Sequence, residues 1–290
     1  MMDANRYKRI YGRGIKREIK YWTVRVNTLK ISSDELENRF EKKNYEFEKL
    51  DWVDGFVIKT NENLSKTIEH SLGYFFLQNP SSMIPPLIIN AKEDDVILDL
   101  CASPGAKTTQ MAVMMGNKGV IVANDIAYNR LKALRGNIQR NGISCAVVTK
   151  MEGTGFWKSG LRFDKILLDA PCTGTGTMNP RILKQTSMGG IRKLSRLQKQ
   201  LLISAEKCLN KNGVIIYSTC SLEPEENEEN MDFAVRNLGL HIEKIDMEIP
   251  NSMKALTEWE GSKYDDSVAN SVRIIPDNIM EGFFICKLRK

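Results

Sequence analysis

The stretch that decides the fold runs from residue 96 to residue 109 and reads VILDLCASPGAKTT. Its first six residues form an apolar run that is typical of a buried parallel strand. The small residues and the glycine that follow predict a turn into a helix, at which backbone N–H groups can approach a ligand closely. The spacing fits neither a P-loop nor the G-x-G-x-x-G dinucleotide fingerprint. The segment therefore indicates either a ligand-binding turn or an ordinary tight connection between a strand and a helix.

Strands and helices alternate along the chain after this segment. Helical patterns are expected at 128–142, ending at Gly142, and at 192–209. The expected strands are 119–125, 145–150, 164–172, 213–221, 241–247 and 282–290. Because parallel strands need crossover helices, the alternation predicts an α/β fold with a doubly wound, Rossmann-like sheet. Ligands of such sheets bind outside the carboxyl ends of the strands, where an acid such as Asp125 commonly accepts hydrogen bonds from ribose hydroxyls.

The residues before this alternation follow a different pattern. A strand is expected at 22–29, a helix at 32–44 that a pair of serines at its start can cap, and a second strand at 52–60. The prolines and polar residues of 64–90 predict an irregular loop between short elements. We therefore expect a small N-terminal α+β region, which either binds a partner or only covers the larger sheet.

The chain carries a net charge of +6, and its basic residues are clustered. Residues 1–20 hold seven basic and two acidic side chains, and residues 181–199 hold six basic side chains and no acid. Such clusters suit contacts with the phosphates of a nucleic acid, although a solvated charged face gives the same pattern. No apolar run is long enough to cross a bilayer, and no apolar stretch follows the basic N-terminus as in a secretory signal. We therefore expect a cytoplasmic protein without a membrane partner.

The six cysteines are spaced unlike a zinc site, since no Cys-x-x-Cys pair occurs and the chain has only two histidines. A disulfide framework is not expected in a cytoplasmic protein of this size. Cys145, Cys208 and Cys286 lie in or beside regular elements and are expected in the core. Cys172 and Cys220 instead follow two strands, among Pro, Gly, Thr and Ser residues. Neighbouring strand ends would place both thiols above one edge of the sheet, and no metal is expected there.

Two thiols at the edge of a sheet indicate covalent catalysis, in which a thiolate adds to the substrate. Asp169 ends one of the two strands and can support such chemistry if it is buried enough to hold a proton. A cation such as Lys107 would favour the thiolate. A helix expected near Pro224 would favour the thiolate of Cys220, whereas the glutamates within 223–229 would oppose it or simply suit the start of that helix.

Four segments together resemble the Sun-domain (Nol/Nop/Sun) family of RNA cytosine-C5 methyltransferases. They are CASPGAKTT at 101–109, NDIAYNRL at 124–131, LDAPCTGTG at 168–176 and YSTCSLEPEENE at 217–228. The resemblance covers about residues 20–290, and the compact layout is most similar to archaeal tRNA methyltransferases of the family. It implies a class I methyltransferase domain at 89–290, preceded by an RNA-binding region at 1–88. It also implies that S-adenosylmethionine donates a methyl group to C5 of cytosine in RNA, with tRNA as the expected substrate and a monomer as the expected state.

The resemblance assigns roles to individual residues. Cys220 matches the family's nucleophile, which adds to carbon 6 of the base, and Cys172 matches the thiol associated with release of the product. Asp169 and Lys107 match partners around the target base. The residues that match cofactor contacts are Cys101, Ala102, Ser103, Pro104, Gly105, Ala106, Lys107, Asp125, Arg130, Glu152 and Asp169.

The chain departs from the family pattern at three positions. Ala106 replaces a glycine and adds a methyl group where the backbone approaches the cofactor. Glu152 is one methylene longer than the usual Asp, and Asn278 stands where a His is common. These departures predict an altered affinity and not a loss of activity.

Several other functions compete with this interpretation. An rRNA cytosine-C5 methyltransferase is the nearest alternative, and a non-catalytic RNA-binding or assembly factor on the same fold is an alternative of a different class. Methyltransferases that act on exocyclic amines or on proteins commonly use a [DN]-P-P-[YF] motif without paired cysteines, and a DNA cytosine-C5 enzyme needs only the Pro-Cys thiol. A cysteine hydrolase is disfavoured because neither His70 nor His241 lies in a motif.

Overall fold

The fold is taken from a computed structural model, in which residues 4–15 and 21–290 are described. Its larger sheet has nine strands among these residues, and five of them, β7-β6-β5-β8-β9, run parallel in that order. Antiparallel strands extend the sheet beyond β9 in the order β15-β14-β11, and β10 also pairs with β15. The strands are β5 Val96–Asp99, β6 Val120–Asn124, β7 Ala146–Thr149, β8 Phe163–Asp169, β9 Leu209–Thr219, β10 His241–Glu243, β11 Ser252–Lys254, β14 Val272–Ile274 and β15 Phe283–Arg289. The predicted doubly wound α/β sheet is therefore confirmed.

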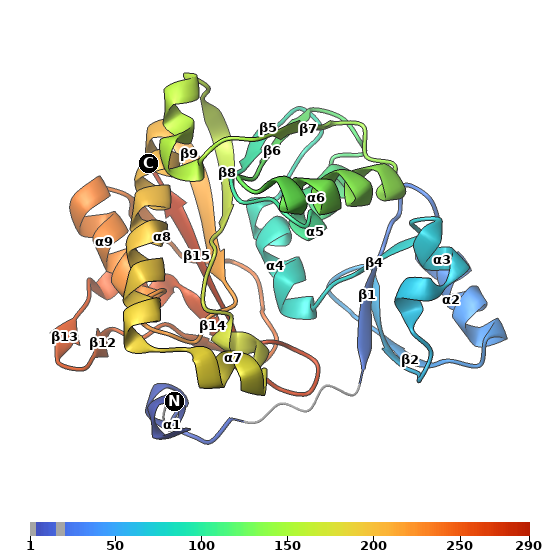
Figure 1. Ribbon diagram of the computed structural model, residues 1–290, viewed down its shortest axis with the longest axis horizontal. Helices are drawn as coiled ribbons and strands as arrows, with labels where there is room; N and C mark the ends of the chain where they lie inside the picture. The colour runs from blue at the N-terminus through green and yellow to red at the C-terminus, as the bar shows by residue number, and fades with distance from the viewer. Residues whose placement is uncertain (1–3, 16–20) are drawn as a thin grey trace.

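Helices cover both faces of this sheet (Figure 1). They are α4 Pro80–Ile89, α5 Ala106–Met114, α6 Tyr128–Asn141, α7 Pro180–Gln185, α8 Met188–Cys208 and α9 Glu228–Leu238. Alternate strand residues face opposite sides, as the pleat requires. Leu98 and Tyr217 pack in one cluster with α8 and α9, whereas Ile97 and Ile216 pack in another with α4 and α5. The core consequently lies on both faces, and the carboxyl ends of the parallel strands stay open at one edge.

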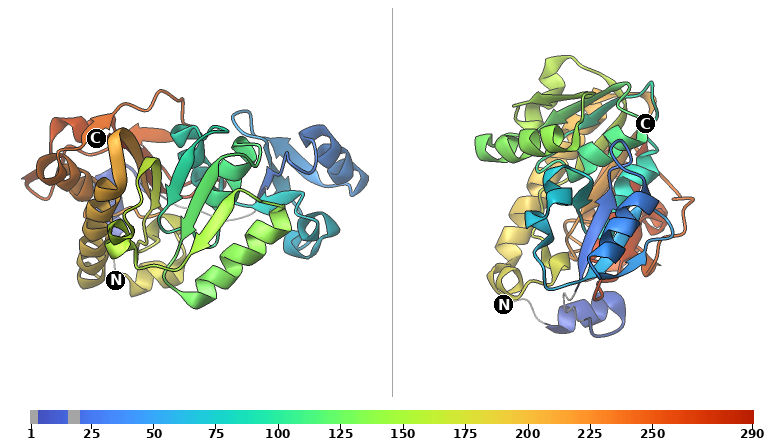
Figure 2. Two further views of the ribbon diagram at one scale, coloured as in Figure 1. Left: turned by 90° about the horizontal axis from the view of Figure 1, so that it is seen from above. Right: turned by 90° about the vertical axis from the view of Figure 1, so that its right-hand side faces the viewer.

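The smaller sheet is antiparallel and lies to one side of the larger one (Figures 1 and 2). It pairs β2 Glu46–Lys49, β3 Gly55–Lys59, β1 Trp22–Val26 and β4 Phe75–Leu77 in that order. Helix α2, Ser33–Lys42, packs on it through Leu36 and Phe40. Ser32 caps this helix by accepting a hydrogen bond from the Glu35 N–H at 3.2 Å, so the predicted cap is confirmed. The remaining elements are α1 Ala4–Tyr11, α3 Ile68–Ser71, β12 Glu258–Trp259, β13 Ser262–Lys263 and the 3-10 turns η1 Leu64–Lys66, η2 Gly153–Ser159, η3 Thr175–Thr177 and η4 Asp266–Asn270.

The prediction of an irregular loop at 64–90 is wrong for residues 80–89, which form α4. Pro80 occupies the first helical position, where a missing N–H costs nothing, and Asn79 caps the helix. Pro86 removes the N–H that would bond to the carbonyl of Ser82 one turn earlier. The side chain of Gln78 replaces that donor, with its Nε2 atom 3.0 Å from the Ser82 carbonyl oxygen. The helix is thus stabilised by a contact that its own sequence pattern does not reveal.

The smaller sheet is attached to the larger domain by a buried arginine. Arg25 of β1 donates to the carbonyl of Ala106 at 2.7 Å and to Thr109 Oγ1 at 2.9 Å, both in the first turns of α5. Among the described residues it has no acidic partner, and burial, together with the charge of Arg140, lowers its pKa to about 9. The start of α5 is therefore held from the smaller sheet as well as from the larger one.

Arg273 and Glu228 form an ion pair that is almost completely buried between β14 and α9. Replacing Arg273 by Met should lower the free energy of unfolding by about 3–5 kcal/mol, because it leaves the Glu228 carboxylate buried without a counter-charge. Urea denaturation checks this value. The matched control is Lys118→Met, which breaks the solvent-exposed pair of Lys118 with Glu93 and should leave the midpoint unchanged. Equal losses in the two variants would contradict the prediction.

Among the described residues, no helix combines the length and the apolar character needed to cross a membrane.

Candidate active site

The two cysteines singled out in the sequence lie next to each other. Strands β8 and β9 are adjacent and parallel, and Asp169 stands opposite Ser218 at their carboxyl ends. The loops that follow bring the Sγ atoms of Cys172 and Cys220 to 3.4 Å from each other. Cys145, Cys208 and Cys286 are buried, as expected for core cysteines.

Lys107 and Asp169 form an ion pair beside these thiols. Lys107 Nζ, in the first turn of α5, is 2.7 Å from Asp169 Oδ2 and 2.9 Å from Ser82 Oγ. Ser218 Oγ donates to the other carboxylate oxygen at 2.8 Å. From the sequence, Asp169 was expected to hold a proton only if it was buried. In the structure its side chain is one-third exposed and forms an ion pair with Lys107. The pair therefore presents a charged donor and a charged acceptor side by side.

A cavity of about 360 Å³ opens over this pair. Cys220, Lys107 and Asp169 line it, whereas Cys172 is not among its lining residues. Its other walls are Asp99, Cys101, Ala102, Ser103, Pro104, Ala106, Ala170, Phe76, Leu77, Gln78, Asn79, Ser82, Glu281 and Phe283. Of the two thiols, the one on Cys220 thus faces the space that a substrate would enter.

The residues between β4 and α4, and those in the first turn of α4, that line this cavity were not identified from the sequence. Gln78, Asn79 and Ser82 line the cavity, and they lie in the segment that was expected to be an irregular loop. The available signal was an Asn directly before a Pro, which is typical of a helix cap followed by the first helical position. Phe283 of β15 was also missed, and its ring lies 5.3 Å from Lys107 Nζ.

A second cavity, of about 210 Å³, lies on the other side of Cys101, which borders both. Asp125, Arg130 and Glu152 line it, together with the apolar side chains of Leu100, Ile126, Pro171, Leu197 and Leu201. Asp125 Oδ2 accepts a hydrogen bond from the backbone N–H of Ser103 at 3.2 Å and lies 3.2 Å from Arg130 Nη2. Apolar walls with two carboxylates, those of Asp125 and Glu152, fit a flat apolar ring that carries hydrogen-bond donors and a neighbouring diol, as in a nucleoside.

The turn between β5 and α5 lines the larger cavity, and Cys101 of this turn also lines the smaller one. All its expected cofactor residues line a cavity except Gly105, which adopts φ +100°. A Cβ atom at Gly105 would stand 2.8 Å from Leu134 and would strain the backbone, so the position needs glycine. The methyl group of Ala106 borders the larger cavity.

Asp99 is a buried carboxyl group on the same wall. Its Oδ2 atom accepts a hydrogen bond from Thr108, but its Oδ1 atom has no partner among the described residues. Burial, opposed by this hydrogen bond and assisted by the charge of Asp169, raises its pKa to about 7. A carboxyl oxygen without a partner at a cavity wall fits a ligand that brings a hydrogen-bond donor, such as an ammonium group.

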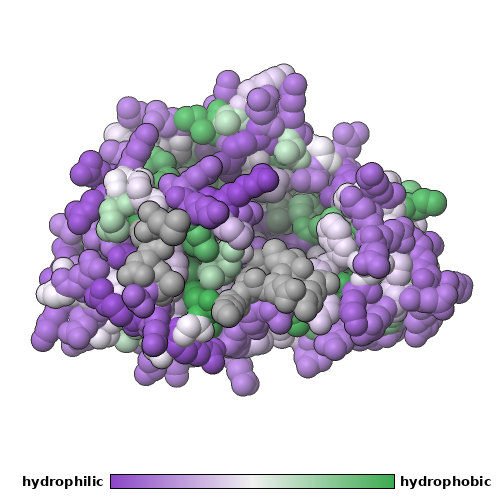
Figure 3. All heavy atoms as spheres, turned by 60° about the horizontal axis from the view of Figure 1, so that its bottom comes forward, coloured by the Kyte–Doolittle hydropathy of each residue, from purple (hydrophilic) through white to green (hydrophobic). Residues whose placement is uncertain are grey.

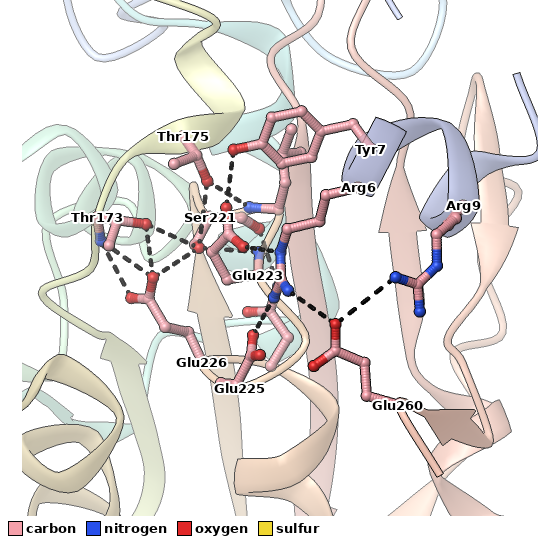
Figure 4. A network of polar contacts seen from close by, with 12 residues as sticks. Arg6, Tyr7, Arg9, Thr173, Thr175, Ser221, Glu223, Glu225, Glu226 and Glu260 are labelled. Carbon is pink, nitrogen blue, oxygen red and sulfur yellow. Dashed lines mark hydrogen bonds and ion pairs between the residues drawn. The ribbon is translucent and has the colours of Figure 1, made fainter. Parts of the chain in front are cut away.

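The acidic run after Cys220 differs from the expected helix start. The helix, α9, begins only at Glu228, and Glu223, Glu225 and Glu226 precede it in buried turns. The run is therefore part of a buried polar network and not a solvated cluster at a helix N-terminus (Figure 4).

The N-terminal helix α1 enters this network. Arg6 pairs with Glu223 at 2.9 Å and with Glu225 at 2.5 Å, and Tyr7 donates to Glu223 at 2.9 Å (Figure 4). Arg6 was expected to be one of the phosphate-binding residues of 1–20, but it is only 8% exposed, so the structure corrects that expectation for this side chain. Lys16, Arg17 and Lys20 of the same cluster lie outside the described residues.

The basic stretch 181–199 lies on the surface of α7 and α8. Lys199 pairs with Glu229 at 2.7 Å. The exposed basic residues that form no ion pair in the described part of the chain are Arg181, Lys184, Arg192, Lys193 and Arg196. The face shown in Figure 3 is largely hydrophilic and is hollowed near its centre. No group of three or more possible metal ligands was found among the described residues.

The chain is similar in sequence and in structure to known RNA methyltransferases. Residues 86–289 match the family model described as "16S rRNA methyltransferase RsmB/F", and residues 12–80 match "N-terminal domain of 16S rRNA methyltransferase RsmF". The chain is 42% identical over 274 residues to a tRNA (cytosine(49)-C(5))-methyltransferase of Pyrococcus abyssi, covering 92% of this chain and 88% of that protein. It is 37% identical to ribosomal RNA small subunit methyltransferase F of Vibrio parahaemolyticus, but it spans only 56% of that protein's length. A crystal structure of a methyltransferase homolog from Pyrococcus horikoshii superimposes with a TM-score of 0.86 at 34% identity, covering 99% of this chain and 93% of that one.

Proposed function

Because the chain belongs to the RsmB/F family of RNA methyltransferases, the Sun-domain family that its motifs resemble, we propose that it methylates C5 of cytosine in tRNA through a covalent bond from Cys220. Its activity is that of an S-adenosylmethionine-dependent RNA cytosine methyltransferase. The observation that supports the covalent route is the 3.4 Å contact of two thiols, of which Cys220 lines the cavity.

The residues around the larger cavity provide what this reaction needs. Cytosine C5 is a weak nucleophile, and addition of the Cys220 thiolate to C6 moves an electron pair toward C5. Lys107 can donate a hydrogen bond to the base at N3 or O2 and so stabilise the charge that this addition creates, while Asp169 accepts from Lys107 and holds it in place. After methylation the proton on C5 passes to water, the electron pair of the C5–H bond re-forms the ring double bond, and the bond from Cys220 to C6 breaks with its electron pair returning to sulfur.

The second cavity is the proposed site of the nucleoside part of S-adenosylmethionine. Asp125 would accept hydrogen bonds from the ribose hydroxyls, and Ile126 and Leu197 would contact the adenine. The free oxygen of Asp99 suits the amino group of the methionine part. When bound, this cofactor supplies an electrophilic methyl group on a sulfonium.

We propose tRNA as the substrate because the chain is 42% identical to the archaeal tRNA methyltransferase and 37% identical to the bacterial rRNA methyltransferase. The target base must leave its stack, at a cost of about a few kcal/mol that contacts with phosphates can offset. The exposed basic residues of α7 and α8 supply such contacts in this proposal. The smaller sheet, within the proposed RNA-binding region 1–88, would present the RNA to the methyltransferase domain at 89–290.

A methylation assay tests the proposed function. Transcripts of tRNA and of small-subunit rRNA, incubated with the protein and S-adenosylmethionine, are read by bisulfite sequencing. We expect 5-methylcytosine in tRNA alone, and none in either RNA when the cofactor is omitted. Methylation of the rRNA alone would identify the alternative substrate. Binding without methylation of either RNA would favour a non-catalytic RNA-binding or assembly factor.

A further inference from the structure

Glu226 connects the two cysteine loops (Figure 4). The residue after Cys172 is Thr173, whose backbone N–H and hydroxyl donate to the Glu226 carboxylate at 3.0 and 2.5 Å. The residue after Cys220 is Ser221, whose hydroxyl donates to the same carboxylate at 2.8 Å. A single side chain therefore holds the residue that follows each thiol.

The groups that donate hydrogen bonds to the Glu226 carboxylate are uncharged. The side chain is completely buried, and it forms no ion pair within the described parts of the chain. A fourth donor, Gln198 Nε2, lies 2.8 Å from its Oε2 atom. Burial raises the pKa of Glu226, whereas the hydrogen bonds from Thr173, Gln198 and Ser221 lower it. Burying a carboxylate without a counter-ion lowers the free energy of unfolding, so Glu226 is expected to have a role other than stabilising the fold.

The backbone around this carboxylate is also fixed. Tyr217 of β9 donates from its hydroxyl to the Glu226 carbonyl at 2.7 Å. Gln198 of α8 donates to the carbonyl of Pro171, the residue before Cys172, at 2.9 Å. Glu226 is thus tied to β9 through its backbone carbonyl and to α8 through its side chain.

We propose that Glu226 is a positioning residue that sets the spacing of the Cys172 and Cys220 thiols. The inference rests on the proposed function, in which one thiol attacks the base and the other assists its release. The contact with Thr173 fixes the position of Cys172, the thiol that assists release. The contact with Ser221 fixes the position of Cys220, the thiol that attacks the base. The pKa of Cys172 is raised by the hydrogen bond between Cys172 and Cys220, by burial, and by the nearby charges of Cys220, Glu226 and Asp169.

The spacing of the Cys172 and Cys220 thiols can be tested without RNA by equilibrating the protein in a buffer of reduced and oxidised glutathione. Formation of a Cys172–Cys220 disulfide removes two hydrogen atoms from the protein and reduces one oxidised glutathione to two thiols. We expect Glu226→Gln to lower the equilibrium constant about tenfold or more, since the effective concentration of one thiol at the other depends on fixed geometry. Mass spectrometry of the peptides measures the linked fraction, and circular dichroism confirms that the variant is folded.

The matched control is Glu229→Gln, in the same acidic run but paired with Lys199 at the surface. It should give the wild-type constant. An unchanged constant in Glu226→Gln, or an equal loss in the control, would overturn the proposal. This result does not depend on whether the protein methylates RNA, so it is separate from a failure of the proposed function.

Two milder variants test each contact separately and apply even if Glu226→Gln does not fold. Thr173→Val removes the hydroxyl on the releasing side, and we expect a covalent protein–RNA adduct to accumulate. Ser221→Ala removes the hydroxyl on the attacking side, and we expect slower adduct formation. In both variants kcat should fall about tenfold, because positioning acts on the reacting atoms. KM for RNA should change little in Ser221→Ala and should fall together with kcat in Thr173→Val, because the covalent intermediate accumulates. Wild-type kcat in both variants, or a change confined to KM, would contradict the assignment.

Discussion

Cys220→Ala is expected to abolish methyl transfer and to leave no covalent adduct with RNA. Of the two adjacent thiols only this one lines the larger cavity, so its loss removes the atom that would bond to C6 of the base. Removal of a catalytic nucleophile can lower kcat by a factor on the order of 10⁶. Transfer of a labelled methyl group to RNA measures the rate, and a denaturing gel detects the adduct.

Cofactor binding provides the internal control for this variant. Cys220 does not border the smaller cavity, so calorimetric titration with S-adenosylmethionine should give nearly the wild-type affinity. Cys145→Ala is the matched cysteine control, because Cys145 is buried away from both cavities and should keep full activity. If activity survives in Cys220→Ala but is lost in Cys172→Ala, the two thiols have the opposite roles.

The sheet and its two cysteines could be predicted because the relevant signals are local. An apolar run of residues ends at Asp169 and another at Thr219, and each is followed directly by small and polar residues. Parallel strands place their carboxyl ends together, so the order of elements alone brings Cys172 and Cys220 to one edge. The geometry at that edge then follows from the pairing of β8 with β9.

Contacts between distant residues explain what the sequence did not reveal. Helix α4 accommodates Pro86 because Gln78, before the helix, supplies the donor that this proline lacks. Arg6 is 217 residues from Glu223, and neither residue alone distinguishes a buried ion pair from a solvated charge. Strand β2 was missed for another reason: it reads Glu-Phe-Glu-Lys and is mostly exposed, so it lacks the apolar pattern that marks a strand.

Cys172→Ala is expected to trap the enzyme on its RNA as a covalent adduct. The hydrogen bond with Cys220, followed by burial and by nearby negative charges, raises the pKa of the Cys172 thiol. Cys172 therefore keeps its proton and can donate it in a hydrogen bond to Cys220 Sγ when the bond to C6 breaks. Without that donor the departing thiolate is less stable, so we expect release to become slower than attack and methyl transfer.

The trapped species can be recognised by its composition. With RNA and S-adenosylmethionine, Cys172→Ala should give a slowly migrating band on a denaturing gel that nuclease digestion returns to the position of the free protein. The band should disappear in Cys172→Ala/Cys220→Ala, because the bond to the base requires the Cys220 sulfur. A band that persists in the double variant would mean that another nucleophile forms the adduct. Normal turnover of Cys172→Ala without any adduct would show that product release does not depend on the second thiol, and the 3.4 Å contact would then need a different explanation.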